Sequence, residues 1–323
     1  MRIENVELRI MITVGGRFWS RLWACLVIII LHSTFSILHS KELTDTIPLT
    51  FEYNMPVVKA LINGQERRFL LDTGSSASIL MLGTGDDYVL AGDSIEMEDA
   101  HGEKELTGYT QADFRLGCFE GKKNFYFMPY NEVLHGLFDG ILGMDYLEYM
   151  GVVVKIDVKR GHLIVTTDKR LFSREKRKKA TYKRDKTDRL PKLKVKMSPG
   201  GKVKNVLFDT GFNEMLELRM EDFERLMNSR RGKAFRQQLT GTAYGGNQGT
   251  AYGGNQGTAL QQRDSVGRTN FRLKEMKALK TKLYDIDAHA EETTDSKLGA
   301  AILNHGAVII KARKRKIYFL PAE

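Results

Sequence analysis

The sequence predicts a mostly β protein with two lobes of similar size. Strand-like runs dominate the chain, and only Met220 to Asn228 has convincing helical spacing, with Met220, Phe223 and Met227 on one face. At 323 residues, 42% of them apolar, the chain exceeds a typical single core and suits two ordinary domains. The tripeptide Asp-Thr-Gly also occurs twice, once in each half.

The expected strands lie in both halves and are rich in β-branched, aromatic and leucine residues. In chain order they are Val57 to Ile62, Glu66 to Leu71, Lys123 to Met128, Val152 to Ile156, Leu163 to Thr167, Lys202 to Phe208 and Ala307 to Lys311. The chain divides into a targeting segment (1–40), a first lobe (41–168), a basic linker (169–191) and a second lobe (192–323). The helical face is expected to pack against a core.

Each Asp-Thr-Gly follows three apolar residues, within Phe69 to Gly74 and within Val206 to Gly211. The apolar run predicts a buried strand, and the tripeptide predicts a tight turn that holds a carboxylate at the strand end. If the two turns meet across a two-fold axis, Asp72 and Asp209 cannot both ionise comfortably and share one proton. Such a pair offers an acid and a base around one water molecule, which is the requirement for hydrolysing an amide without a metal.

These motifs resemble those of the aspartic peptidases, more closely the retropepsin-like families of bacteria than the larger pepsins. The resemblance covers most of residues 45–323. Its second element, an apolar pair followed by glycine, occurs within Phe138 to Leu147 and, less closely, within Asp295 to Gly299. Asp139 precedes Gly143 by four residues, as Asp295 precedes Gly299.

The resemblance implies a bilobal, pepsin/retropepsin-like acid protease fold with two pseudo-symmetric, β-barrel-like lobes in one chain. It implies an endopeptidase that hydrolyses protein or peptide substrates with Asp72 and Asp209 as the catalytic pair, as a monomer, without a cofactor or a metal. The residues expected to support the catalytic loops are Thr73, Gly74, Ser75, Thr210, Gly211, Gly143 and Gly299.

The second half departs from the family pattern at two positions. Lys297 replaces an apolar residue, so we expect different packing beneath the second catalytic loop. Phe212 replaces the usual Ser or Ala, whereas Ser75 of the first half retains a hydroxyl that can hydrogen-bond the carboxylate. We therefore expect Asp72 to hold its charge more easily than Asp209.

Two segments are candidates for flaps over the substrate. The first is Ile95 to Tyr109, with its turn near residues 101 and 102, and the second contains an octapeptide repeated at 242–249 and 250–257. A neutral insertion in a surface loop is the alternative interpretation of the repeat. The candidate flap residues are His101, Gly102, Tyr244 and Tyr252.

The N-terminus has the composition of an export signal. Arg17 and Arg21 precede ten apolar residues, Leu22 to Leu31, and small residues follow. The segment predicts either a cleaved signal or a membrane tether formed by residues 22–38, with a periplasmic or extracellular location. After cleavage only Cys118 of the two cysteines would remain, so no internal disulfide could form.

Lys169 to Lys196 is strongly basic, with fourteen Lys and Arg against three acidic residues, a net charge of +11 where the whole chain carries +10. The segment could contact an anionic surface weakly. The alternative is a solvated, poorly ordered linker, because Phe172 and Tyr182 are its only aromatic residues. No specific nucleic-acid binding is expected.

Other hydrolase and nucleotide-binding classes lack support. The seven His do not form a metallopeptidase helix motif, and neither a Gly-x-Ser-x-Gly elbow nor a phosphate-binding Gly-Lys-Ser/Thr loop is present. Two alternatives to a single-chain peptidase remain. One is an inactive bilobal peptide-binding protein, and the other is an enzyme active only as a homodimer of first lobes.

Overall fold

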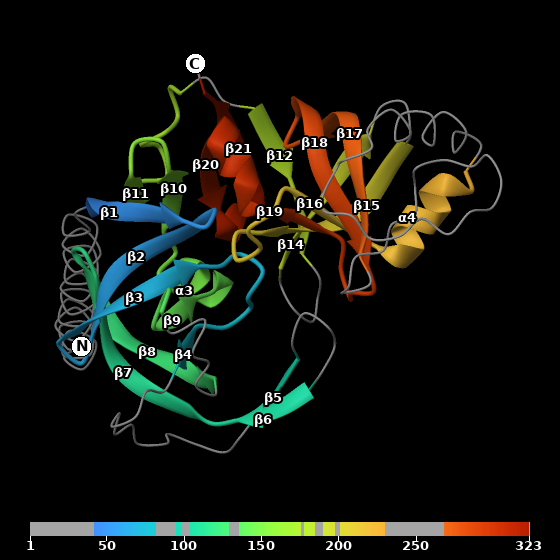
Figure 1. Ribbon diagram of the computed structural model, residues 1–323. Helices are drawn as coiled ribbons and strands as arrows, with labels where there is room; N and C mark the ends of the chain where they lie inside the picture. The colour runs from blue at the N-terminus through green and yellow to red at the C-terminus, as the bar shows by residue number, and fades with distance from the viewer. Residues whose placement is uncertain are drawn as a thin grey trace, which may run out of the picture. The chain divides into compact units, whose positions relative to one another are not determined.

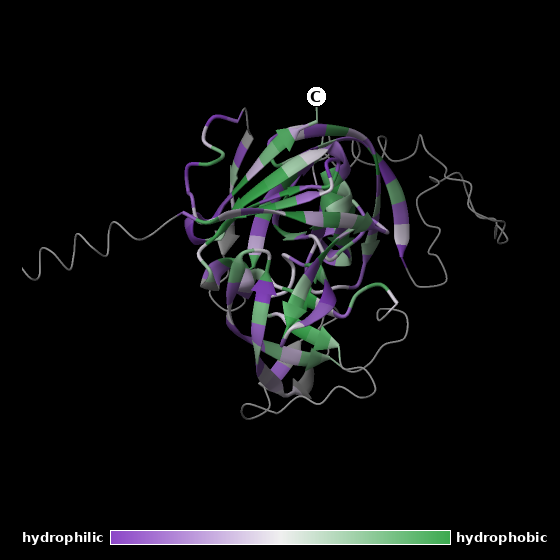
Figure 2. Ribbon diagram, turned by 90° about the vertical axis from the view of Figure 1, so that its left-hand side faces the viewer, coloured by the Kyte–Doolittle hydropathy of each residue, from purple (hydrophilic) through white to green (hydrophobic). Residues whose placement is uncertain are grey.

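Alternating exposure gives the strands one face toward a core and one toward solvent. In β7 (Tyr109–Leu116), every second residue from Thr110 to Leu116 is buried and the residues between them are exposed. Figure 2 shows the same alternation of apolar and polar colours along several strands. The structure, a computed structural model, describes residues 42–81, 95–98, 104–128, 136–175, 178–184, 190–197, 201–229 and 268–322.

The described strands repeat in a similar order in the two halves (Figure 1). The first half contains β1 (Thr44–Glu52), β2 (Met55–Ile62), β3 (Gln65–Leu71), β4 (Ile79–Met81), β5 (Ile95–Glu98), β6 (Lys104–Thr107), β7, β8 (Phe119–Met128), β9 (Gly140–Leu142), β10 (Val153–Asp157) and β11 (His162–Thr166). The second half contains β12 (Lys178–Thr181), β13 (Lys183–Arg184), β14 (Pro191–Met197), β15 (Gly201–Asp209), β16 (Leu216–Arg219), β17 (Thr269–Ala278), β18 (Thr281–Glu291), β19 (Lys297–Gly299), β20 (Gly306–Lys311) and β21 (Lys316–Pro321).

Each half closes six strands into a barrel. The first barrel has the order β2-β3-β9-β4-β8-β7 and closes through β2 and β7. The second has the order β14-β15-β19-β16-β18-β17 and closes through β14 and β17. Position by position, the strands of one barrel have counterparts in the other. The mostly β, bilobal fold predicted from the sequence is therefore confirmed.

The halves also share a sheet. Its strand order is β12-β21-β20-β10-β11-β1, and the halves meet where β10 pairs antiparallel with β20, with Val154 opposite Ile310. Strands β1, β11 and β10 on one side correspond to β12, β21 and β20 on the other. All four residues Val154, Ile156, Val308 and Ile310 are at most 2% exposed, so the core continues across this junction.

The expected elements are present, and the structure adds others. All seven expected strands overlap observed ones, and α4 (Met220–Met227) packs Met220 and Phe223 into the core. The sequence analysis did not identify α3 (Met144–Tyr149) or the 3-10 helix η1 (Ala300–His305). Each of these helices follows a glycine expected to support a catalytic loop.

The basic segment differs from a plain solvated linker where the structure describes it. Strand β12 pairs with β21 in the shared sheet, with Lys179 opposite Tyr318. Phe172 and Tyr182 are 3% and 2% exposed, and the Tyr182 hydroxyl donates to the Ala312 carbonyl at 3.2 Å. Both aromatic rings are therefore core residues and are not exposed for stacking on a ligand.

The expected export segment, residues 1–40, lies outside the described residues, so its role stays a prediction. Among the described helices, none combines the length and the apolar composition needed to cross a membrane. Cys118 is exposed and has a free thiol.

Candidate active site

Asp72 and Asp209 stand at equivalent strand ends. Strands β3 and β15 each carry a buried apolar run that leads into the acid, and each pairs in parallel with a short strand of its own barrel. The Asp72 N–H donates to the Leu142 carbonyl at 3.0 Å, and Asp209 lies opposite Gly299. Buried strands fix both backbone positions, so the acids extend from rigid elements.

Backbone N–H groups hold each carboxylate in the same way. In the first loop, Oδ1 of Asp72 accepts hydrogen bonds from the N–H groups of the residues two and three positions further on, at 2.7 and 3.2 Å. In the second loop, Oδ1 of Asp209 accepts the corresponding bonds at 2.9 and 3.1 Å. These bonds fix the orientation of the acids and leave one oxygen of each for the other carboxyl group or a reactant.

The two carboxyl groups meet. The carboxyl group of each acid lies beside the glycine of the opposite loop, and each acid shifts the pKa of the other. A Cβ atom at Gly211 would fall 2.6 Å from Cγ of Asp72, and Gly74 faces the Asp209 carboxylate in the same way. Glycine is therefore required at both positions, because any side chain would displace the opposite acid.

The threonines of the two tripeptides join the loops reciprocally. The Thr73 hydroxyl donates to the Phe208 carbonyl at 2.5 Å and accepts from the Thr210 N–H at 3.1 Å. The Thr210 hydroxyl donates to the Leu71 carbonyl at 2.6 Å and accepts from the Thr73 N–H at 3.0 Å. Both side chains are almost fully buried, so these four bonds hold the loops together without competition from water.

Gly143 and Gly299 pack directly beneath the loops. The backbone N–H groups that follow them donate to the carbonyls of Ser75 at 2.8 Å and of Phe212 at 2.7 Å. A Cβ at Gly143 would lie 2.9 Å from the Ser75 carbonyl oxygen, and one at Gly299 would lie 2.5 Å from that of Phe212. The structure thus brings together all nine residues assigned from the sequence to the acids and their support.

Burial raises the pKa of both acids. For Asp72, hydrogen bonds from Asp209 and from the backbone partly offset this rise in pKa. For Asp209, the negative charge of Asp72 adds to burial and raises the pKa well above its usual value. The pKa of Asp209 is raised further than that of Asp72, and the pair favours a state with one shared proton.

The Ser75 hydroxyl is not the cause of this difference. It donates to the Ala77 carbonyl at 2.7 Å, and only the Ser75 backbone N–H contacts Asp72. The sequence analysis expected this hydroxyl to reach the carboxylate, and the structure corrects that interpretation. The difference comes from the pair itself, because the negative charge of Asp72 raises the pKa of Asp209.

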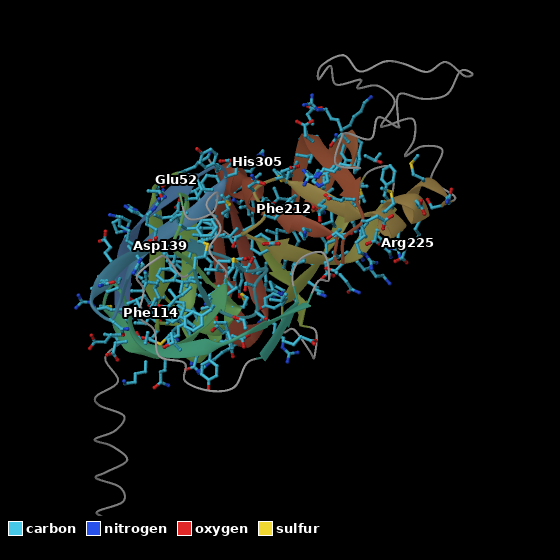
Figure 3. All side chains as sticks on the ribbon, turned by 60° about the horizontal axis from the view of Figure 1, so that its bottom comes forward. Glu52, Phe114, Asp139, Phe212, Arg225 and His305 are labelled. Carbon is cyan, nitrogen blue, oxygen red and sulfur yellow. The ribbon has the colours of Figure 1, made fainter. Side chains whose placement is uncertain are left out.

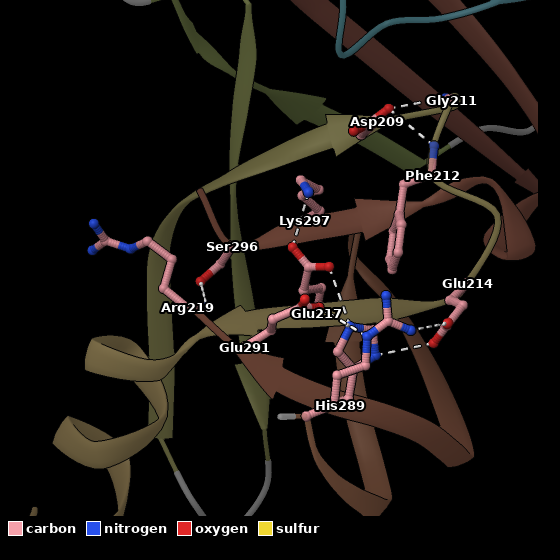
Figure 4. A network of polar contacts seen from close by, with 11 residues as sticks. Asp209, Gly211, Phe212, Glu214, Glu217, Arg219, His289, Glu291, Ser296 and Lys297 are labelled. Carbon is pink, nitrogen blue, oxygen red and sulfur yellow. Dashed lines mark hydrogen bonds and ion pairs between the residues drawn. The ribbon is translucent and has the colours of Figure 1, made fainter. Parts of the chain in front are cut away.

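A partly buried network of charged residues lies next to the Asp209 loop (Figure 4). Lys297 Nζ is 2.9 Å from Glu217 Oε1, and His289 Nε2 is 3.2 Å from Glu217 Oε2. His289 Nδ1 is 3.0 Å from Glu214 Oε2. Arg268 Nε lies 2.9 Å from Glu291 Oε2, and its Nη1 lies 3.5 Å from Glu214 Oε1. We call these six residues the Lys297 network.

Sequence analysis noted Lys297 but not the other members. Glu217, His289 and Glu291 become neighbours because β16 pairs in parallel with β18 across more than 70 intervening residues. No local spacing could have shown this contact.

Figure 3 shows Phe212 beside the strands of the second half, and its ring centroid lies 6.0 Å from that of His289.

Glu217, His289 and Glu291 offer ligand atoms within 4.8 Å of one another, which is close enough to hold a metal ion. These atoms are already engaged in the Lys297 network. Burial lowers the pKa of His289, but hydrogen bonds to Glu214 and Glu217 outweigh this and raise the pKa to about 9. A protonated imidazole has no free lone pair for a metal, so the set acts as an ion-pair cluster.

The candidate flap residues cannot be placed. His101, Gly102, Tyr244 and Tyr252 lie outside the described residues. Strands β5 and β6, on either side of the expected first turn, form an antiparallel hairpin, with Ile95 opposite Thr107. The octapeptide repeat falls between α4 and β17, the chain position that β5 and β6 occupy in the first half.

Three further aspartates have structural partners. The Asp139 carboxylate, labelled in Figure 3, accepts from the Arg68 N–H at 2.7 Å. Asp145 pairs with Lys123, and Asp295 lies 3.1 Å from Lys192 Nζ. These contacts agree with the sequence expectation that such residues close turns or ion pairs.

Comparison with protein families gives a match over part of the chain. A family model described as aspartyl protease matches residues 58–146, from β2 into α3, a range that includes Asp72 and Gly143. No curated protein matches the chain. The match covers less than half of the chain and lies in the first half, so it likens this part of the chain to the aspartyl proteases.

Proposed function

We propose that the protein is an aspartic-type endopeptidase in which Asp72 and Asp209 activate one water molecule between them. The observation that carries this proposal is the meeting of the two carboxyl groups, each fixed by two backbone N–H groups. Burial and mutual repulsion favour a single shared proton, so one residue serves as base while the other serves as acid.

The reaction proceeds in two steps. In the first, Asp72 takes a proton from water, the water oxygen bonds to the peptide carbonyl carbon, and Asp209 gives its proton to the carbonyl oxygen. In the second, the ionised member takes a proton from one hydroxyl of the tetrahedral intermediate, and the protonated member gives its proton to the nitrogen as the C–N bond breaks. The products are a carboxylic acid and an amine, and the pair again holds one proton.

The substrate class we propose is an extended peptide segment bound by strand-like backbone hydrogen bonding. The β5–β6 hairpin occupies the chain position expected for a flap, which supports closure over such a segment. We propose that the chain acts as a monomer, since it supplies both acids itself.

The test is cleavage of a complex peptide mixture, mapped by mass spectrometry with and without a statine-type transition-state inhibitor. Asp72→Asn and Asp209→Asn should each lower the cleavage rate at least about a thousandfold, because each variant leaves the pair without its acid or its base. Sedimentation should show a monomer.

Other outcomes favour the alternatives. Activity that survives Asp209→Asn, together with a dimer in sedimentation, would favour pairing of two first lobes. Inhibitor binding without any cleavage by the wild-type chain would favour an inactive peptide-binding protein. A matched control is Asp113→Asn, because Asp113 is exposed on β7 and should leave cleavage unchanged.

A further inference from the structure

The two barrels differ in chemistry at equivalent positions. In the first barrel Ile141 lies opposite both Leu70 and Ile79, and all three are buried in an apolar cluster. In the second barrel the same strand pairings place Lys297 opposite Leu207 and Glu217. A buried ion pair thus occupies the positions that two isoleucines occupy in the other half.

The difference extends to the next strand. Ile79 lies opposite Tyr126, whereas Glu217 lies opposite His289. The Lys297 network then closes through Glu214, Glu291 and Arg268. Three acids alternate with three bases, so the charges of the network cancel.

A structural role alone does not account for this arrangement. Lys297 is 8% exposed, and Glu217 and His289 are 3% and 1% exposed, so their charges are largely removed from water. Replacement of a buried ion pair by apolar residues of similar volume often leaves a protein as stable as before or makes it more stable. At the equivalent position of the first barrel, the cluster around Ile141 consists of apolar residues.

The network reaches the catalytic loop through Phe212. Lys297 Nζ lies 5.6 Å from the centroid of the Phe212 ring, and the Phe212 N–H donates to Asp209 Oδ1 at 3.1 Å. The ammonium group also acts directly on the acid: it lowers the pKa of Asp209, against the larger raising effects of burial and of Asp72. The residue at the equivalent position near Asp72 is Ile141, which carries no charge.

We propose that Lys297, whose ammonium group is held by Glu217 over the Phe212 ring, is a positioning residue for the Asp209 loop that keeps the pair active at more acidic pH. The inference rests on the proposed function. Within the described part of the chain, Asp72 of the opposite loop and the other five members of the Lys297 network face this site. Since the pKa of His289 is about 9, the histidine stays protonated through the acidic range.

The main test variant is Lys297→Ile combined with Glu217→Ile, which copies the first barrel and removes the pair together, so it should fold. The singly protonated pair is the active form. Loss of the nearby positive charge makes the acids bind protons more strongly, so the pair becomes doubly protonated at a higher pH. The whole pH profile of kcat/KM should move upward by about half a unit to one unit. Lys297→Ile alone should move the pH profile further upward, because the negative charge of Glu217 then remains without its partner.

Two controls separate charge from packing. Lys297→Arg keeps the charge and should keep the wild-type profile. Lys155→Met removes a lysine that is 6% exposed and pairs with Glu175 at 3.2 Å in the shared sheet, and it should not shift the profile. A double variant whose rate falls equally at all pH values, without a shift, would show a merely structural role and overturn the proposal.

A second measurement does not depend on cleavage. Carbon-13 NMR of the aspartate carboxyl groups in the intact chain should show the pair titrating at higher pH in the double variant than in the wild type. A titration shift without cleavage of any peptide would contradict the proposed function and support the role of Lys297. Unchanged titration would overturn the role of Lys297 even if the enzyme cleaves.

Discussion

At the residue scale, a few buried polar contacts fix the geometry between the acids. Both Asp-Thr-Gly motifs and their glycines were visible in the sequence, because each needs only a local turn after an apolar strand. The members of the Lys297 network were not visible, since their contacts depend on strand pairing. The same limit applies to Ser75, whose hydroxyl has the right chemistry but donates to Ala77.

Replacement of Thr210 by valine tests the reciprocal threonine bonds. The change preserves shape but leaves the Leu71 carbonyl and the Thr73 N–H buried without their partner. Unfolding free energy from urea titration should fall by about 2 to 4 kcal/mol. Thr50→Val removes a hydroxyl that bonds the exposed Glu52 at 2.8 Å and should stay within about 0.5 kcal/mol of wild type. Equal losses in the two variants would contradict the role of the buried bonds.

At the element scale, strands with long apolar runs were predicted correctly, and strongly charged strands were missed. Strand β14 alternates lysine with buried apolar residues, and β17 alternates apolar residues with Lys, Arg and Glu. In both strands, the many charged residues hid the alternation of buried and exposed positions that marks a strand. Helix α3 was missed because it has only six residues, and it begins directly after a glycine whose role is to pack beneath a loop.

Replacement of Gly299 by alanine tests that packing. The φ of Gly299 is −90°, which alanine adopts freely, so the effect is purely steric. The added methyl group would press on the Phe212 carbonyl and ring and displace the loop that carries Asp209. Peptide cleavage should fall at least about tenfold, with a loss of about 1 to 3 kcal/mol in stability. Gly121→Ala, in β8, meets no atom within 4 Å and is the matched control. A fully active Gly299→Ala variant would contradict the steric argument.

At the scale of the whole molecule, the two halves are joined by the shared sheet as well as by the catalytic loops. Length and the doubled motif predicted two lobes. They did not predict this junction, because β10 and β20 are separated by about 150 residues and each resembles an ordinary buried strand. One apolar core runs through residues of both halves.

The junction predicts a single cooperative unfolding transition. Since β10 and β20 bury apolar residues against each other, neither half can unfold without exposing the core of the other. Hydrogen exchange measured by mass spectrometry across a urea series should give the same midpoint for peptides from β3 and from β15. Two separate midpoints would mean that the halves unfold independently.

Strand β12 stands at the end of its sheet, so one side of its backbone has no strand neighbour within the described part of the chain. Such an edge invites a second molecule to add its own strand, a common first step toward aggregates. Lys179 is exposed on β12 and carries a positive charge there, and two identical edges would repel each other. The basic composition of this stretch thus discourages self-association, a benefit to solubility that requires no external ligand.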